Sequence, residues 1–297
     1  MPISADLKSL LKIKRKNLIK QLNKVSTKHN GKSWLIIPDN NIKHNICLVA
    51  HIDTVHNEVK NKKLYHDVKE NIMFSPNGLG ADDRAGVYAM LKIYSMMPED
   101  KKPILLFTDF EESGGIGASS CSSYSDTLNN ISYFIELDRH NNNECVFYNG
   151  EDNTFIKHIE SYGFKENIGT FSDISILGTM YNVSSVNLSI GYYHEHTLHE
   201  YLNVNDMNDT IDKACKIIRD HDYKTKWTLP AGRKYRYHFD DYWDHDNDYN
   251  NIYDIETEEM FYCENCYNEF FNEDNVGILC PYCDFKLTKL KEGELKY

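Results

Sequence analysis

The stretch ICLVAHID (residues 46–53) joins a run of five apolar residues directly to a histidine and an aspartate. A short, uninterrupted apolar run is typical of a strand that is buried on both faces of a parallel sheet. Similar, largely apolar runs occur at residues 104–108, 133–137 and 186–190. We interpret the four runs as strands of one buried sheet.

Helical patterns lie around these runs. Apolar residues recur at helical spacing between residues 7 and 25, with lysines among them, which predicts one amphipathic helix packed against the sheet. Residues 84–97 form a second helix, ended by Pro98, and residues 206–220 a third, with Asn205 or Asp206 as its N-cap. Strands alternating with helices predict an α/β fold with a mixed, mostly parallel sheet sandwiched by helices.

Composition restricts the function classes. The chain has 297 residues, 41% of them hydrophobic, which is enough for a sizeable core. It has no apolar run long enough to cross a membrane, and lysines interrupt the N-terminal segment where a signal peptide would have its apolar core. We therefore expect a cytoplasmic protein without membrane partners. The net charge of −12 disfavours nucleic-acid binding.

The eight cysteines fall into two groups. Four are isolated and are expected to be buried as small hydrophobic residues: Cys47, Cys121, Cys145 and Cys215. The other four form two CxxC pairs separated by thirteen residues. In a cytoplasmic chain this spacing predicts a structural zinc rather than disulfides or a redox motif, with the ligands Cys263, Cys266, Cys280 and Cys283.

The chain therefore divides into a main domain (residues 1–232), an acidic and aromatic linker (233–258) and a zinc ribbon with four cysteine ligands (259–297). Nine acidic residues and no Lys or Arg lie between residues 240 and 259, which is typical of a linker or loosely packed arm. From residue 259 onward eight acidic residues outnumber four basic ones. The ribbon is thus expected to stabilise the protein or contact another protein rather than nucleic acid.

Candidate metal ligands follow the predicted strands, at the sheet edge where open α/β folds place their sites. His51 ends the first strand, and Asp53 is positioned to hold the second nitrogen of its imidazole. Asp82, at the start of a helix among small residues, could bridge two cations, although an N-cap is the ordinary role of such an aspartate. Asp138 ends the strand at residues 133–137.

Two further motifs complete the set. The pair Glu111 and Glu112 follows the strand at residues 104–108 and could divide two tasks, with Glu112 binding metal and Glu111 taking a proton from water. Near two cations the pKa of Glu111 would fall, so this base would be ionised at neutral pH. The run HEHTLH (residues 194–199) contains three histidines, and any of them could be the remaining ligand.

In this order the motifs resemble the co-catalytic di-zinc peptidase clan, which includes the M20, M28 and M42 families. The clan's pattern is HxD, an Asp often followed by Asp, EE, an Asp, and a His four residues before a Glu. His196 stands four residues before Glu200 and is selected on that basis. The resemblance implies that one zinc is bound by His51, Asp82 and Asp138 and the other by Asp82, Glu112 and His196. It also implies a cis peptide bond between Asp82 and Asp83.

The spacing of the motifs resembles the lid-free M28 aminopeptidases most. Only 57 residues lie between Asp138 and His196, too few for the M20 lid domain, and only 30 lie between His51 and Asp82, too few for the M42 barrel. Phe171-Ser172-Asp173 also resembles a segment of the M28 family. The implied fold is zinc exopeptidase-like, and the main domain is then the catalytic domain.

The resemblance implies a zinc-dependent exopeptidase, most simply an aminopeptidase, that acts on a peptide or small amide. Glu111 would be the general base, and Tyr192 or Tyr193 could stabilise the oxyanion. Co²⁺ or Mn²⁺ would also suit these ligands. Two alternatives stay open: an N-acyl amino acid amidohydrolase, and a non-catalytic binding protein on the same fold. A homo-oligomer also stays open.

Overall fold

The computed structural model describes residues 6–40, 42–59 and 61–231, and beyond them three short strands at residues 260–262, 269–271 and 288–289. The chain divides into two compact units, Met1–Tyr237 and His238–Tyr297. In the second unit β13 (Met260–Tyr262) pairs antiparallel with β14 (Glu269–Phe271) and with β15 (Thr288–Lys289). The predicted linker and the predicted zinc ligands lie outside the described residues, namely Cys263, Cys266, Cys280 and Cys283.

The first unit is built on the predicted sheet. Its central strands are parallel and match the four apolar runs closely: β6 (Ile104–Thr108), β3 (Cys47–His51), β7 (Phe134–Arg139) and β10 (Ser185–Ser189). Shorter strands extend the sheet to eight: β1 (Lys28–His29) and β2 (Ser33–Ile36) beyond β6, and β8 (Glu144–Val146) and β9 (Lys165–Asn167) beyond β10. The mixed, mostly parallel α/β fold is therefore confirmed.

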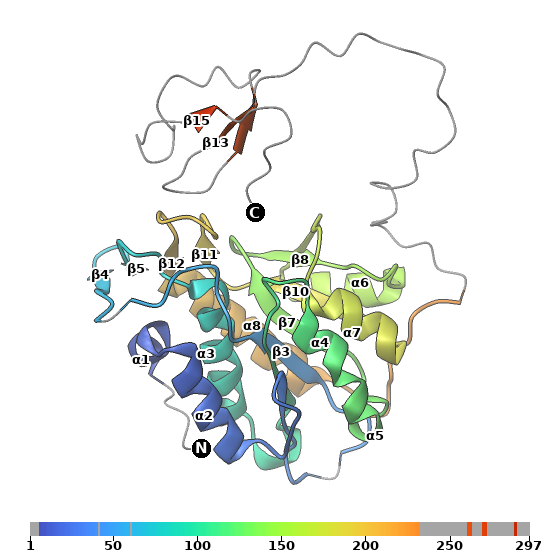
Figure 1. Cartoon of the computed structure of the whole chain (residues 1–297). Helices are drawn as coiled ribbons and strands as arrows, with labels where there is room; N and C mark the ends of the chain where they lie inside the picture. Colours follow the sequence, from blue (N-terminus) through green and yellow to red (C-terminus); the bar gives the residue numbers. More distant parts are fainter. Residues whose placement is uncertain are drawn as a thin grey trace, which may run out of the picture. The chain divides into compact units, whose positions relative to one another are not determined.

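Helices cover both faces of this sheet (Figure 1). Alternate side chains of a strand point to opposite faces, so Leu48 and Ala50 of β3 join one hydrophobic core and Cys47 and Val49 the other. The first core is closed by α1 (Leu7–Lys12), α2 (Arg15–Val25), α3 (Ala81–Met96), α6 (Asn153–Glu160) and α8 (Val204–Asp220). The second is closed mainly by α4 (Ile116–Ser119), the 3-10 turn Ser120–Tyr124, α5 (Ser125–Leu128) and α7 (Asp173–Tyr181). A further 3-10 turn, Glu99–Lys101, has no buried residue. All four isolated cysteines are buried, as predicted.

A second, four-stranded antiparallel sheet was not predicted. Its order is β11-β12-β5-β4, with β11 (Tyr192–Tyr193), β12 (Tyr201–Asn203), β5 (Ile72–Phe74) and β4 (Tyr65–Asp67). The histidine-rich segment connects β11 to β12, and β12 pairs with β5. This sheet therefore ties the histidine-rich loop to the segment between β3 and α3.

Two predicted helices differ in detail. The pattern at residues 7–25 forms two helices, α1 and α2, because Ile13 and Lys14 are extended. At the break Glu58 accepts a hydrogen bond from the backbone N–H of Arg15, whose guanidinium binds both oxygens of Asp109. The bond to Glu58 satisfies the backbone N–H of Arg15, which has no helical partner at the break. The N-cap of α8 is Asn203 and not Asn205 or Asp206. The side chain of Asn203 accepts hydrogen bonds from the backbone N–H groups of these two residues.

No helix in the described part of the chain combines the length and the apolar character needed to span a membrane.

Candidate metal centre

The predicted ligands converge at the carboxyl edge of the central strands. His51 is the last residue of β3, Asp138 lies near the end of β7, and Glu112 follows β6. Asp82 lies in the first turn of α3, and His196 is carried by the loop between β11 and β12. Five segments that are far apart in the sequence thus deliver one side chain each to a single place.

Asp82 lies between the two histidines. Its Oδ1 is 2.9 Å from Nε2 of His51, and its Oδ2 is 3.1 Å from Nε2 of His196. His51 Nε2 is also 3.6 Å from Asp138 Oδ1, and His196 Nε2 is 3.2 Å from Glu112 Oε2. One carboxylate therefore presents one oxygen to each of two groups of donors.

The donor set fits two divalent ions. Ligand atoms about 2.0–2.2 Å from one zinc ion lie roughly 3.4 Å apart in a tetrahedral site, and the distances above, from 2.9 to 3.6 Å, surround that value. His51, Asp82 and Glu112 also have ligand atoms close enough to share one ion, as do His51, Asp83 and Asp138. Oε1 of Glu112 is buried without a hydrogen-bond partner in the described structure, as expected of an oxygen reserved for a cation.

His194, His196 and His199 are all exposed in this loop, and among the described residues only His196 of the three contacts the donor carboxylates, those of Asp82 and Glu112.

Asp53 contacts both His51 and the glutamate pair. Its Oδ1 is 3.4 Å from Nδ1 of His51, longer than a good hydrogen bond. Its two oxygens accept hydrogen bonds from the backbone N–H groups of Glu111 (3.2 Å) and Glu112 (3.3 Å). Asp53 thus fixes the position of the glutamate loop in addition to facing the imidazole, a role that the sequence did not indicate.

Glu200 holds the turn that carries Asp82. It is buried, and its carboxylate accepts from the backbone N–H of Gly80 (2.6 Å) and of Asp82 (2.9 Å). It also lies 2.6 Å from Nε2 of His56. The sequence analysis used Glu200 only to choose His196 among the three histidines. It did not predict that Glu200 holds the turn of Asp82.

The peptide bond between Asp82 and Asp83 is cis, which confirms the expectation drawn from the resemblance.

Replacing Glu200 by glutamine should weaken this turn. The NH2 group of the new amide cannot accept a hydrogen bond, so one backbone N–H would lose its acceptor. An unsatisfied buried donor costs about 1–3 kcal/mol. We expect a lower free energy of unfolding, measured by denaturant titration, together with weaker metal binding. Glu160→Gln, at an exposed position of α6, is the matched control and should leave both quantities unchanged. Equal stability of the two variants would contradict the role of Glu200.

The electrostatics of the site favour cations. Asp82 and Glu112 raise the pKa of His196 to about 11. Burial disfavours the charged form of His51, but its neighbouring carboxylates outweigh burial and raise its pKa well above the usual range. Burial raises the pKa of Glu111 to about 8 and of Asp138 to about 7. Bound divalent cations would neutralise this excess of negative charge and lower the pKa of the carboxylates.

A pocket opens beside the donors. Its lining includes Asp82, Glu111, Asp138 and His196 together with the side chains of Tyr148, Phe171, Tyr192 and Glu195. The carboxylate of Glu111 has no hydrogen-bond partner among the described residues, so it is free to accept a proton. The hydroxyl of Tyr192 donates to Oδ1 of Asp138 (3.1 Å), whereas that of Tyr193 donates to Asp206. Of the two tyrosines only Tyr192 lines the pocket.

The segment Phe171-Ser172-Asp173 begins in the lining of this pocket, which includes Phe171 but not the other two residues. The hydroxyl of Ser172 donates to the buried Glu136, and Asp173 is buried without a partner for either oxygen in the part of the chain described. Burial raises the pKa of Asp173 to about 7. The sequence analysis singled out this segment only because it resembles a segment of the M28 family. It predicted no role for Glu136.

The fold and the converging ligands define a metallopeptidase of the co-catalytic clan. Residues 35–172 match the model of "Peptidase family M28", which confirms the resemblance to the co-catalytic di-zinc peptidase clan. The protein is accordingly a hydrolase that acts on peptide bonds. The matched segment includes His51, Asp82, Glu111, Glu112 and Asp138, while His196 lies beyond it. None of the curated proteins matches the chain.

Solved structures share the fold at low sequence identity. Aminopeptidase PepT from Bacillus cereus ATCC 10987 has a TM-score of 0.56 and 15% identity, covering 71% of this chain and 96% of its own. Aminopeptidase APDkam598 from the archaeon Desulfurococcus kamchatkensis has a TM-score of 0.56 and 12% identity, covering 73% and 94%. The TET1 peptidase of Pyrococcus horikoshii has a TM-score of 0.54 and 12% identity, covering 71% and 98%.

Proposed function

We propose that the protein is an aminopeptidase that depends on two divalent metal ions, zinc in the first instance. The observation that carries this proposal is the geometry of Asp82, whose two oxygens face His51 and His196 separately. One ion is assigned to His51, Asp82 and Asp138, and the other to Asp82, Glu112 and His196. Co²⁺ or Mn²⁺ would suit the same nitrogen and oxygen donors.

When bound, the ions polarise the scissile carbonyl and lower the pKa of a water molecule. Glu111 takes the proton of the attacking water, because its carboxylate lies in the pocket and has no other partner among the described residues. The same carboxyl group then returns the proton to the departing amine. Asp53 supports this step by holding the backbone of Glu111 and Glu112 in place.

The charge of the pocket supports an amino-terminal substrate. Besides Asp82 and Asp138, which are assigned to the ions, its lining holds the carboxylates of Glu111 and Glu195, against Arg139 and His140 as the basic groups. Arg139 is paired with Glu144, and His140 with Glu195. Such a lining favours a positively charged amino terminus over a carboxylate.

A substrate panel distinguishes the candidate activities. We expect hydrolysis of aminoacyl-anilides and slower or no hydrolysis of N-acyl amino acids. The reverse preference would identify an N-acyl amino acid amidohydrolase, the second candidate. No hydrolysis of either class by metal-loaded protein would favour a binding protein on the same fold.

Location, assembly and the ribbon are secondary proposals. Four buried, unpaired cysteines support a reducing compartment such as the cytoplasm.

The TET1 peptidase "can assemble into a tetrahedron or a large octahedral shell", and we propose that this chain also forms homo-oligomers. We further propose that Cys263, Cys266, Cys280 and Cys283 bind one structural zinc ion.

Deletion of residues 259–297 should leave the catalytic activity of the first unit unchanged. All its proposed ligands lie before residue 200, and the two compact units divide between residues 237 and 238. We expect the truncated protein to fold and to hydrolyse small substrates at the rate of the full chain. Normal folding and metal content with lost activity would contradict this and make the ribbon part of the substrate gate.

A further inference from the structure

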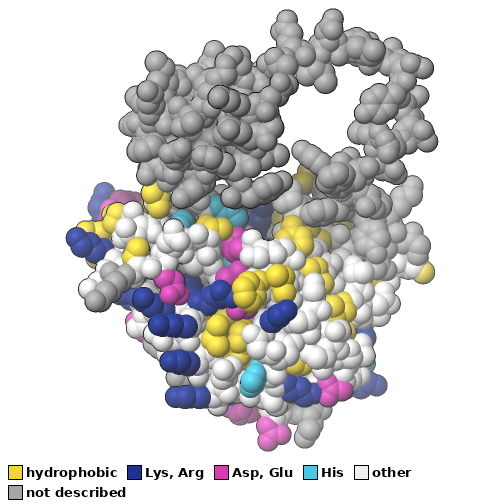
Figure 2. Space-filling view, in the orientation of Figure 1, with side chains coloured by type: hydrophobic (Ala, Val, Ile, Leu, Met, Phe, Trp, Pro, Cys, Tyr) yellow, Lys and Arg dark blue, Asp and Glu magenta, His cyan; other side chains and the backbone are white. Residues whose placement is uncertain are grey.

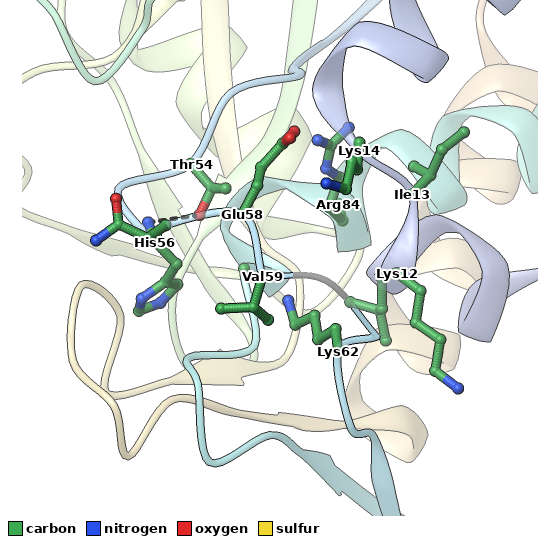
Figure 3. A pocket seen from close by; sticks show the side chains of 12 residues that line it. Lys12, Ile13, Lys14, Thr54, His56, Glu58, Val59, Lys62 and Arg84 are labelled. Atoms are coloured by element: carbon green, nitrogen blue, oxygen red, sulfur yellow. Dashed lines mark hydrogen bonds between the residues drawn. The ribbon is translucent and has the colours of Figure 1, made fainter.

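A second pocket lies between the end of α1 and the break that follows it, the segment after β3 and the first turn of α3. Its lining includes Lys12 and Lys14, Thr54, residues 56–59, Lys62 and Arg84. Figure 3 shows these side chains coming from separate segments of the chain to surround one space. Four of the lining residues are cationic and one, Glu58, is anionic, although the whole chain carries a net charge of −12.

The buried cation in this pocket is Arg84. Only 4% of the residue is exposed, and its Nη1 is buried with no hydrogen-bond partner. No side-chain hydrogen bond or ion pair of Arg84 is found within the described part of the structure. A guanidinium has five N–H donors and is always charged, so leaving it buried and unpaired is costly.

The carboxylates around Arg84 are bonded to other donors. Both oxygens of Asp109 bind the guanidinium of Arg15. Those of Asp53 accept from the glutamate loop, and those of Asp83 from backbone N–H groups of His51 and Gly86. Glu58 accepts from the backbone of Arg15. These groups attract Arg84 through space but do not pair with it.

Lys62 adds a second incompletely paired cation. Its ammonium donates to the backbone oxygen of Leu79 at 2.5 Å, which leaves two of its three donors without a partner among the described residues. Burial, together with the nearby charge of Arg84, lowers the pKa of Lys62 to about 8. Two cations that repel each other across a pocket are the arrangement that an anion between them would stabilise.

We propose that this pocket binds a small oxyanion, a phosphate or carboxylate group, between the guanidinium of Arg84 and the ammonium of Lys62. The planar fork of Arg84 matches two oxygens of such a group, and the ammonium of Lys62 matches a third. Lys12 and Lys14 also line the pocket. Figure 2 shows further basic side chains over α1 and α2, which would attract anions to this face.

The proposed oxyanion site is distinct from the substrate pocket, because the two pockets share no lining residue. They are connected through Glu200, however. His56 and Gly80 line the oxyanion pocket, and both contact the carboxylate of Glu200, which also holds the backbone of Asp82. The site is therefore placed to bind a separate ligand close to the metal centre.

The test is calorimetric titration of metal-loaded, full-length protein with inorganic phosphate and, in parallel, with acetate. Lys62→Gln should weaken phosphate binding by about tenfold or more, the loss expected for one charge-assisted hydrogen bond. Arg84→Met should abolish it. Lys92→Gln, at an exposed position of the same helix as Arg84, is the control and should bind phosphate like the unmodified protein.

His196→Ala separates this site from the metals, which can also bind phosphate. Binding that survives His196→Ala but weakens in Lys62→Gln supports the proposal. Binding that is lost in His196→Ala and unchanged in Lys62→Gln belongs to the metals and overturns it, as does a complete lack of binding by the unmodified protein. Binding of phosphate without acetate identifies a phosphate group as the ligand, and comparable binding of both identifies oxyanions in general.

Discussion

Glu111→Gln is expected to lower kcat at least about 10²-fold, the smaller end of the usual contribution of a general base. Glutamine has nearly the same size, and the backbone N–H that binds Asp53 is unchanged. The variant should therefore keep both ions and bind substrate normally while it cannot accept the proton. The measurement is kcat on an aminoacyl-anilide together with metal content.

Glu160→Gln, at an exposed position far along the chain, is the control for this comparison and should retain full turnover. Wild-type turnover in Glu111→Gln would mean that another group is the base. Loss of metal along with turnover would mean that Glu111 is a ligand instead.

Gly86→Ala is expected to destabilise the protein by at least about 2 kcal/mol, although alanine normally favours a helix by roughly 1 kcal/mol over glycine. A Cβ at this position would lie 2.3 Å from the backbone oxygen of Leu137 and 2.3 Å from Oδ1 of Asp83. Helix α3 would have to move away from β7. Since α3 carries Asp82 and β7 carries Asp138, metal binding should weaken as well.

The measurement for Gly86→Ala is the free energy of unfolding by denaturant titration, with Lys92→Ala on the same helix as control. The side chain of Lys92 is exposed, so its replacement should change stability by no more than about 0.5 kcal/mol. A Gly86→Ala protein as stable as the control would show that α3 and β7 are not packed as closely as described.

The sequence predicted the elements whose pattern is local. The four central strands are short apolar runs. His51, Glu112 and Asp138, which lie at or just beyond the ends of three of them, were proposed as ligands because strand ends meet at one edge of the sheet. The end of α3 before Pro98 followed from the chemistry of proline. These features need no knowledge of distant contacts.

Other features depend on contacts between distant segments. The break between α1 and α2 is held by Glu58 and Asp109, which no local pattern links to Arg15. The sheet of β4, β5, β11 and β12 joins strands of two or three residues, too short to show a periodic pattern. Glu200 could have been noticed as the glutamate four residues after His196, but its bonds to Gly80 and Asp82 appear only in three dimensions.

Asp82 is the residue on which the proposed two-metal centre depends most, because it is the ligand common to both ions. Metal content per chain, measured for the full-length protein and for Asp82→Ala, tests this directly. We expect about three zinc ions per chain in the unmodified protein, two at the catalytic centre and one in the ribbon, and about one in the variant. A single ion that survives Asp82→Ala and is lost in Cys263→Ser would contradict the two-metal centre.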